Sequence, residues 1–280
     1  MKKMQKKFRM IIDVALCHDC NNCFLACKDE HWDNDNMPIS VSTPRHGHRW
    51  MNLFTKERGQ APLQDVATLA HPCQHCDNAP CIKAGDGAVY KRADGIVIID
   101  PVKAVGKKLL LDACPYHVIF WNEEKNIPQK CTGCAHLLDA GWKEPRCVQI
   151  CPTGALSFAM MNNAEMEKRI ADEGLEVFHP EYGTQPSVYY KNLYRFTKCH
   201  VAGSIAIDEG RECADGAKIV LMNLTTSQSQ ETITNNYGDF KIDNLDDNSG
   251  DYQLEITFNG DSKSFTIALK ESVNVGTIVL

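Results

Sequence analysis

The stretch Cys17-His-Asp-Cys20-Asn-Asn-Cys23-Phe-Leu-Ala-Cys27 places four cysteines within eleven residues, with the spacing Cys-x2-Cys-x2-Cys-x3-Cys. This is the ligand spacing of an iron–sulfur cluster loop. The first three thiolates can face one cluster, whereas the fourth lies on the following helical segment and points away from it. In proteins with two such clusters, the fourth Cys ligates the other cluster. Zinc sites use pairs of ligands separated by a longer loop, so zinc or a disulfide is the less favoured interpretation.

The chain has 14 cysteines among its 280 residues, and twelve of them lie between Cys17 and Cys151. Its composition, 43% hydrophobic and 24% charged residues, is that of an ordinary globular protein with room for two domains. Repeated Cys-x2-Cys pairs in a chain of this length indicate metal thiolates, because disulfide frameworks belong to short secreted domains.

Three further cysteine groups follow the first. The second is Cys73, Cys76 and Cys81, with Gly85 at the position of a fourth thiolate. The third is reduced to Cys114. The three positions that would complete its loop are Ala104, Lys107 and Leu110, none of which binds iron. The fourth group consists of Cys131, Cys134, Cys147 and Cys151.

If each fourth Cys serves the neighbouring cluster, the twelve thiolates form three complete sets with no remainder. A partner cluster of the second group would have needed Ala104, Lys107, Leu110 and Gly85, and it has then lost all four ligands together. The alternative for Cys114 is a small buried apolar residue. We therefore predict three [4Fe–4S] clusters, with the ligand sets Cys17, Cys20, Cys23 and Cys151; Cys27, Cys131, Cys134 and Cys147; and Cys73, Cys76, Cys81 and Cys114.

Residues 28–70 carry no cluster cysteine but are rich in charge, aromatic residues and histidine. We interpret them as a polar insertion that packs over a cluster or faces a partner subunit. Imidazole replaces thiolate at some iron–sulfur centres, so ligation by His31, His46 or His48 is the alternative. Because the cysteine sets are complete, no coordination position remains for a histidine.

Short strands and turns alternate around the cysteine groups, and one helix is expected over residues 164–173, with Asn163 as its N-cap and Gly174 as its stop. The aromatic run over residues 188–196 is expected to pack as a strand on the cluster domain; an exposed docking strand is the alternative. Beyond residue 199 the pattern predicts a β-sandwich or barrel. Its seven strands are 204–207, 218–222, 231–234, 239–242, 252–258, 264–267 and 276–280, with Asn259-Gly260 as a hairpin turn.

Residues 200–280 contain 13 acidic and 5 basic side chains, a net charge of −8, so the rest of the chain carries about +2 of the total of −6. The sequence shows no clustered basic face of the kind that would indicate a nucleic-acid partner. The basic start, Met1–Met10, is followed by too short an apolar run for a signal peptide or a membrane span. We expect a cytoplasmic protein without direct membrane insertion. Export in folded form with a partner that carries the signal is the alternative.

We find no phosphate-binding loop, nucleophile elbow or paired carboxylates, and we predict no catalytic residue in this chain. The sequence predicts an α+β protein. Residues 1–198 form a ferredoxin-like domain with three clusters and the insertion 28–70, and residues 199–280 form a β-sandwich domain.

The four cysteine groups and Cys151-Pro-Thr-Gly-Ala155 resemble the iron–sulfur subunits of bis-molybdopterin enzymes of the dimethyl sulfoxide reductase type. Within this family, the closer resemblance is to the small subunits of pyrogallol–phloroglucinol transhydroxylases. That resemblance is carried by long stretches such as Gly47-His-Arg-Trp-Met-Asn52, Cys131-Thr-Gly-Cys-Ala-His-Leu-Leu-Asp139 and Tyr189-Tyr-Lys-Asn-Leu-Tyr-Arg-Phe196. Residues 200–221 and 237–240 resemble transthyretin-like or carboxypeptidase-regulatory sandwiches, which usually serve contacts.

The resemblance implies an electron-transfer subunit bound to a large catalytic subunit. That partner would hold molybdopterin guanine dinucleotide with molybdenum or tungsten and would act on polyhydroxylated aromatics, by hydroxyl transfer between pyrogallol and phloroglucinol. Three alternatives stay open. The complex could be a phenol or catechol dehydroxylase or hydroxylase, the clusters could have a structural role without electron transfer, or the chain could be a zinc-binding scaffold.

Overall fold

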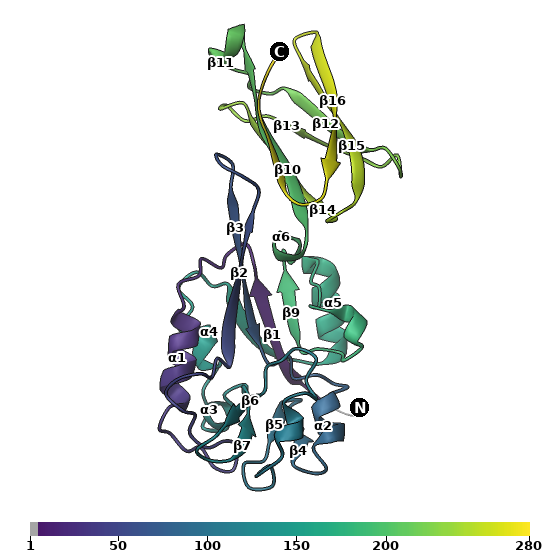
Figure 1. Ribbon diagram of the computed structural model, residues 1–280. Helices are drawn as coiled ribbons and strands as arrows, with labels where there is room; N and C mark the ends of the chain where they lie inside the picture. The colour runs from purple at the N-terminus through teal and green to yellow at the C-terminus, as the bar shows by residue number, and fades with distance from the viewer. Residues whose placement is uncertain (1–4) are drawn as a thin grey trace. The chain divides into compact units, whose positions relative to one another are not determined.

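The structure is a computed structural model that describes residues 5–280 (Figure 1), so the first four residues of the basic start lie outside the described part. The chain forms two compact units. The first comprises residues up to Phe54 and Thr68–Leu193, and the second comprises Thr55–Ala67 and Tyr194–Leu280. The division falls after Leu193 rather than after residue 198. Residues 55–67, expected within the insertion of the first domain, belong to the second unit.

Short elements make up the first unit. In chain order they are β1 (Lys7–Asp13), α1 (Asn22–His31), β2 (Met51–Arg58), β3 (Asp65–Pro72), α2 (Pro80–Ala84), β4 (Val89–Lys91), β5 (Val97–Ile99), the 3-10 helix Lys108–Leu110, β6 (Phe120–Asn122), β7 (Ile127–Gln129), α3 (Ala135–Asp139), α4 (Arg146–Gln149), β8 (Leu156–Met161), α5 (Asn163–Glu173), the 3-10 helix Pro180–Tyr182 and β9 (Val188–Lys191). No helix among residues 5–280 is long and apolar enough to span a bilayer.

Strand β1 is the centre of a three-stranded sheet with the order β8-β1-β9. It pairs antiparallel with β8 and parallel with β9. Phe8, Met10 and Ile12 are each at most 1% exposed, as expected for an apolar central strand whose side chains are covered by the rest of the unit. Residues 188–191 thus pack as a strand of the first unit, whereas Tyr194–Thr197 form a short helix, α6.

Helix α5 lies beside this sheet and packs Met166 against Ile11 (Figure 1). The predicted helix is present, but its N-cap is Asn162 and not Asn163. The Asn162 side chain accepts from the Glu165 N–H, and the Glu165 carboxylate accepts from the Asn162 N–H, which forms a capping box. Gly174 ends the helix with a φ of 63°.

The second unit contains almost only strands. They are β10 (Cys199–Ile207), β11 (Glu212–Cys213), β12 (Lys218–Asn223), β13 (Ser229–Ile233), β14 (Asp239–Leu245), β15 (Gly250–Phe258), β16 (Asp261–Leu269) and β17 (Val273–Val279), with a 3-10 helix at Asp208–Gly210. One sheet has the order β11-β10-β14 with β17 on the other side of β10, and the second has the order β13-β12-β15-β16.

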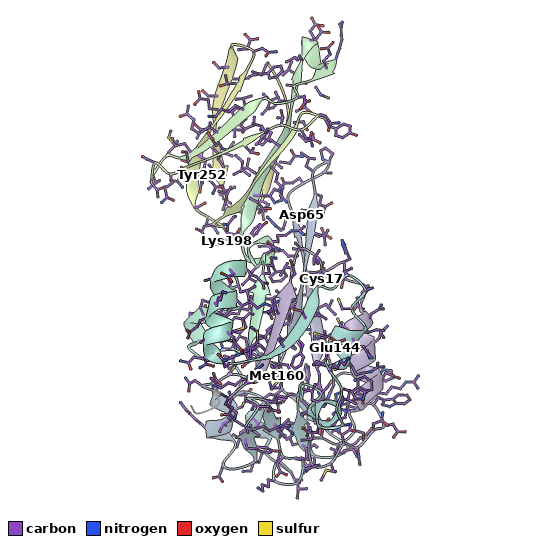
Figure 2. All side chains as sticks on the ribbon, turned by 180° about the vertical axis from the view of Figure 1, so that it is seen from behind. Cys17, Asp65, Glu144, Met160, Lys198 and Tyr252 are labelled. Carbon is purple, nitrogen blue, oxygen red and sulfur yellow. The ribbon has the colours of Figure 1, made fainter. Side chains whose placement is uncertain are left out.

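A single apolar core, which includes Val201, Leu221 and Leu254, unites the two sheets of this unit; Tyr252, marked in Figure 2, belongs to it. Asn259 and Gly260 form the two-residue turn between β15 and β16, with φ angles of 49° and 96°, so the hairpin prediction is confirmed. The two-residue strand β11 was not predicted, because it is too short to show an alternating pattern.

The hairpin of β2 and β3 was also not predicted, because its strands mix charged and apolar residues without strict alternation. Its outer part, residues 55–67, carries Arg58, whose side chain is completely buried. The guanidinium donates to the Asp243 carboxylate, to Nδ1 of His200 at 3.1 Å and to the Arg195 carbonyl at 2.9 Å. It also lies 3.5 Å from Asp65. Arg58 therefore joins the hairpin end to the strands of the second unit.

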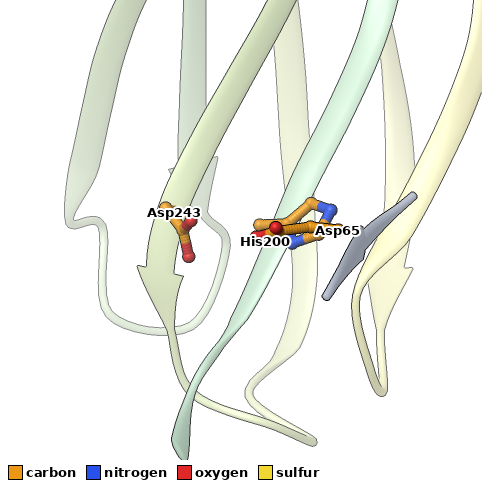
Figure 3. Close-up of side chains that lie close together, drawn as sticks. All are labelled: Asp65, His200 and Asp243. Carbon is orange, nitrogen blue, oxygen red and sulfur yellow. The ribbon is translucent and has the colours of Figure 1, made fainter. Parts of the chain in front are cut away.

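Asp65, His200 and Asp243 bring their ligand atoms within 4.8 Å of one another (Figure 3), a grouping that could surround a metal ion. Cations of the chain already occupy this place. Lys241 Nζ lies 2.8 Å from Asp65 and 3.1 Å from Asp243, and Arg58 binds both carboxylates. Burial and the charges of Lys241 and Arg58 lower the pKa of His200 to about 4, so its ring stays neutral and accepts from Arg58. We interpret the group as an ion-pair network.

We expect Asp243→Asn to destabilise the protein by about 3 kcal/mol, because it leaves a buried guanidinium without one of its two carboxylates. The measurement is urea-induced unfolding followed by circular dichroism. Glu231→Gln is the matched control, since Glu231 pairs with Lys218 at 2.8 Å on the surface of the same unit and should change the stability little.

The effect should depend on pH. Burial opposes ionisation of Asp243, but the Asn244 N–H and the charges of Arg58 and Lys241 outweigh it and lower its pKa. A group with a lowered pKa in the folded state stabilises above its unfolded pKa of about 3.9, and this contribution disappears as the pH falls through the folded value. Wild type and Asp243→Asn should therefore converge in acid. An equal difference at all pH values would contradict the ion-pair interpretation.

Candidate iron–sulfur sites

The sheet of the first unit brings the two ends of the cysteine-rich region together. Because β1 and β8 are antiparallel, the end of β1 lies opposite the start of β8, and the Asp13 N–H donates to the Ala155 carbonyl at 2.8 Å. The loop after β1 carries Cys17, labelled in Figure 2, and the loop before β8 carries Cys151. The two thiols are close enough for the charge of Cys151 to oppose the ionisation of Cys17.

We call the resulting group site A; it consists of Cys17, Cys20, Cys23 and Cys151. Burial and the neighbouring thiols Cys17, Cys151 and Cys20 raise the pKa of Cys23 to about 12. Cys151 behaves differently. Burial opposes its ionisation, but hydrogen bonds from Leu156, Thr153 and Ala155 outweigh this effect and lower its pKa. Cys20 is exposed, so site A borders on the surface of the unit.

Site B consists of Cys27, Cys131, Cys134 and Cys147. Cys27 and Cys147 lie on α1 and α4, which pack together, and Cys134 is the residue before α3. Glu30 of α1 joins all three helices. Its carboxylate hydrogen-bonds to His136 Nε2 at 3.0 Å and lies 3.3 Å from Nε of Arg146. Burial, followed by the charges of the other site B thiols, raises the pKa of Cys27 and of Cys147 far above the usual range.

Site C consists of Cys73, Cys76, Cys81 and Cys114, which are all buried in one apolar core. Pro80 begins α2 and places Cys81 in its first turn. Burial and the thiols Cys73, Cys114 and Cys81 raise the pKa of Cys76 to about 12, against a hydrogen bond from Thr184. Cys114 lies in the same apolar core as the other three thiols, and this position fits both the ligand prediction and the alternative of a small buried apolar residue.

The three Cys-x2-Cys loops share a backbone feature that the spacing alone does not reveal. The residue two positions after the first Cys has a left-handed conformation in each, with φ angles of 53° at Asp19, 44° at His75 and 60° at Gly133. A left-handed residue reverses the chain locally, so the two cysteines of each pair can face the same side. At the third loop, the Gly133 N–H also donates to Cys131 Sγ at 3.3 Å.

These groups suit an iron–sulfur cluster. Burial, followed by repulsion between neighbouring thiolates, raises most of these pKa values, and bound iron would supply the compensating positive charge. A zinc ion with bonds of about 2.3 Å would hold its sulfur ligands about 3.8 Å apart. Among residues 5–280, no three cysteine sulfurs lie within 4.8 Å of one another. None of the three sites in the described residues therefore has the close sulfur grouping that one zinc ion would need.

The histidines of the insertion make packing contacts. His31 is buried against the rings of Trp50 and His136, at centroid distances of 4.6 and 5.3 Å, and burial lowers its pKa to about 3. His48 hydrogen-bonds through Nε2 to the Trp121 carbonyl at 2.9 Å. His46 is exposed. Such contacts fit the interpretation of these side chains as a packed polar insertion.

Sequence reasoning missed one charged residue at these sites. Lys130 is 3% exposed and lies directly before Cys131. Its position beside a ligand was visible in the sequence, but a lysine in a polar loop gives no sign that it will be buried.

Comparison with known proteins agrees with this geometry. A family model described as a 4Fe-4S dicluster domain matches residues 64–161. The pyrogallol hydroxytransferase small subunit of Pelobacter acidigallici is 48% identical over 98% of this chain and 100% of its own length. The similarity to that relative therefore covers both units.

Two other relatives are subunits of reductases. The thiosulfate reductase electron transfer subunit of Salmonella typhi is 28% identical, over 72% of this chain and 99% of its own. A tetrathionate reductase subunit of Salmonella typhimurium is 33% identical, over 67% of this chain and 73% of its own. The resemblance to iron–sulfur subunits that the cysteine groups indicated is confirmed.

Cys199 and Cys213 lie outside the three sites and differ sharply in exposure. Cys199 is 1% exposed, and burial together with the charge of Asp247 raises its pKa to about 12, whereas Cys213 is exposed.

Alkylation needs an accessible thiolate. We expect iodoacetamide to modify Cys213 in the native protein and to leave Cys199 unmodified, as measured by peptide mass spectrometry. Modification of Cys199 at a comparable rate would contradict this assignment, and Cys213→Ser is the control for background labelling.

Proposed function

This chain belongs to the family of iron–sulfur subunits that includes the pyrogallol hydroxytransferase small subunit, and we propose that it is the electron-transfer subunit of a complex that acts on polyhydroxylated aromatic compounds. One observation supports the proposal: cysteines from segments far apart in the sequence, such as Cys17 and Cys151, or Cys27 and Cys131, lie near one another. We propose that each ligand set contains three cysteines of one loop region and a fourth from another, as expected for [4Fe–4S] ligation.

We propose that sites A, B and C each hold one [4Fe–4S] cluster, which supplies a one-electron carrier. The chain's contribution is to hold the thiolates and to control their surroundings. The apolar core around site C excludes water, hydrogen bonds from residues 153–156 stabilise the Cys151 thiolate, and Cys20 leaves site A accessible. Such differences in burial and hydrogen bonding give clusters different potentials.

We further propose that a large catalytic subunit completes the protein. It would hold molybdopterin guanine dinucleotide with molybdenum or tungsten and would contain the substrate site. The relative that matches nearly the whole chain is named a hydroxytransferase, which favours hydroxyl transfer between pyrogallol and phloroglucinol. We assign the first unit to a ferredoxin-like cluster domain. The second, with its two sheets around one core, fits a transthyretin-like or carboxypeptidase-regulatory-like sandwich that serves contacts.

The ligand sets predict how single substitutions act. Cys27→Ser should remove the cluster of site B, with about four irons lost per chain from a total of about 12. Its Mössbauer and electron paramagnetic resonance (EPR) spectra should match those of Cys147→Ser, which comes from the same site, and differ from those of Cys23→Ser, which comes from the same loop. Cys199→Ser should keep all the iron. Spectra of Cys27→Ser that match Cys23→Ser would overturn the pairing.

Hydroxyl transfer makes a separate prediction. Moving a hydroxyl group from one phenol to another needs no net electrons. We expect the purified complex to convert pyrogallol to phloroglucinol with a tetrahydroxybenzene as co-substrate and without an external donor or acceptor, as measured by chromatography of the products. Turnover that requires a reductant or oxidant would instead identify a dehydroxylase or hydroxylase. Turnover without any reduction of the clusters by substrate would identify a structural role for them.

A further inference from the structure

Lys130 is the most deeply buried cation of the first unit with no carboxylate partner. It follows β7, and the residue is 3% exposed. Lysine is almost never fully buried unless it is paired. Among residues 5–280, no carboxylate lies within ion-pair distance of Lys130 Nζ, so a different kind of partner must stabilise this charge.

Two carbonyls accept hydrogen bonds from the Lys130 amino group. Nζ donates to the Val97 carbonyl and to the Cys131 carbonyl at 3.1 Å. An ammonium group has N–H donors and no acceptor, so these carbonyl partners fit the charged form.

The thiols that interact with this charge come from two different sites. Cys73 and Cys81 belong to site C, and Cys131 belongs to site B. No thiol of site A is among the strongest interactions of this charge. Lys130 thus lies directly beside Cys131 of site B, and its hydrogen bond to the Val97 carbonyl holds its amino group at the apolar core that contains the site C cysteines.

We propose that Lys130 is a tuning residue that raises the reduction potentials of the clusters in sites B and C relative to that in site A. Reduction adds one negative charge to a cluster, and a buried cation favours that state because the protein interior screens it weakly. Net charge is one of the factors that set cluster potentials, and Lys130 supplies a positive charge beside both sites. The inference rests on the proposed cluster ligands.

The chain offers a matched control in Lys91. Its Nζ donates to the Cys76 carbonyl at 2.6 Å, so it also lies beside site C. However, it pairs with Asp77 at 2.7 Å, and its side chain is 22% exposed. Because a carboxylate and solvent offset its charge, removal of Lys91 should affect the clusters much less than removal of Lys130.

The test is an anaerobic redox titration of the full-length protein in its complex, followed by EPR, for wild type, Lys130→Met, Lys130→Gln and Lys91→Met. The EPR signal of each site is assigned from the spectrum of a variant in which a cysteine of that site is replaced by serine. In Lys130→Met we expect the equilibrium constant for reduction to fall at least tenfold at sites B and C, a shift of about 59 mV or more to lower potential. Site A and the Lys91→Met protein should change less than threefold. Lys130→Gln keeps a donor without the charge and should resemble Lys130→Met.

Each other outcome is informative. Full iron content with unchanged potentials in both Lys130 variants would overturn the tuning role and leave the cluster assignment intact. Loss of clusters in both variants would assign Lys130 a structural role and also overturn it. Wild-type protein without [4Fe–4S] spectra would reject the proposed function itself.

Discussion

Mutual repulsion between buried thiolates is the constraint on which the first unit depends. Each site places four sulfurs together, and burial with the neighbouring thiols raises the pKa of most of them. Groups of this kind are unfavourable unless positive charge joins them. Binding of a metal cluster and folding are therefore expected to be coupled, as in other small metal-binding domains. This also explains how a unit of such short strands and helices can hold its loops in place.

The secondary structure of the first unit serves mainly to bring distant loops together. The antiparallel pairing of β1 with β8 joins the first and last cysteine groups, and the packing of α1 on α4 brings Cys27 to Cys147. One carboxylate, Glu30, contacts both His136 and Arg146 and so links the helices of site B. These contacts connect the same distant segments of the chain that the proposed ligand sets connect. A shift of the β1–β8 register would therefore separate ligands as well as strands.

In the second unit, the buried charge is balanced by ion pairs and hydrogen bonds. Arg58 has no exposed side-chain surface, and the surrounding carboxylates, His200 and a backbone carbonyl satisfy it. Lys130 in the first unit is the contrasting case, since its hydrogen-bond partners are two backbone carbonyls. In one unit the buried cation stabilises packing, and in the other it lies where it can act on electron carriers.

The sequence by itself determined which chemistry to expect. The spacing of twelve cysteines predicted the three ligand sets, and these sets stay a prediction. Alternating apolar residues likewise determined most strands of the second unit, because that signal is local. Tertiary structure alone decided the rest. Residues 55–67 join the second unit through Arg58, Asn162 caps α5, and Lys130 is buried between two sites. The physical reason is that burial and ion pairing depend on residues brought together from distant segments, which local spacing does not encode.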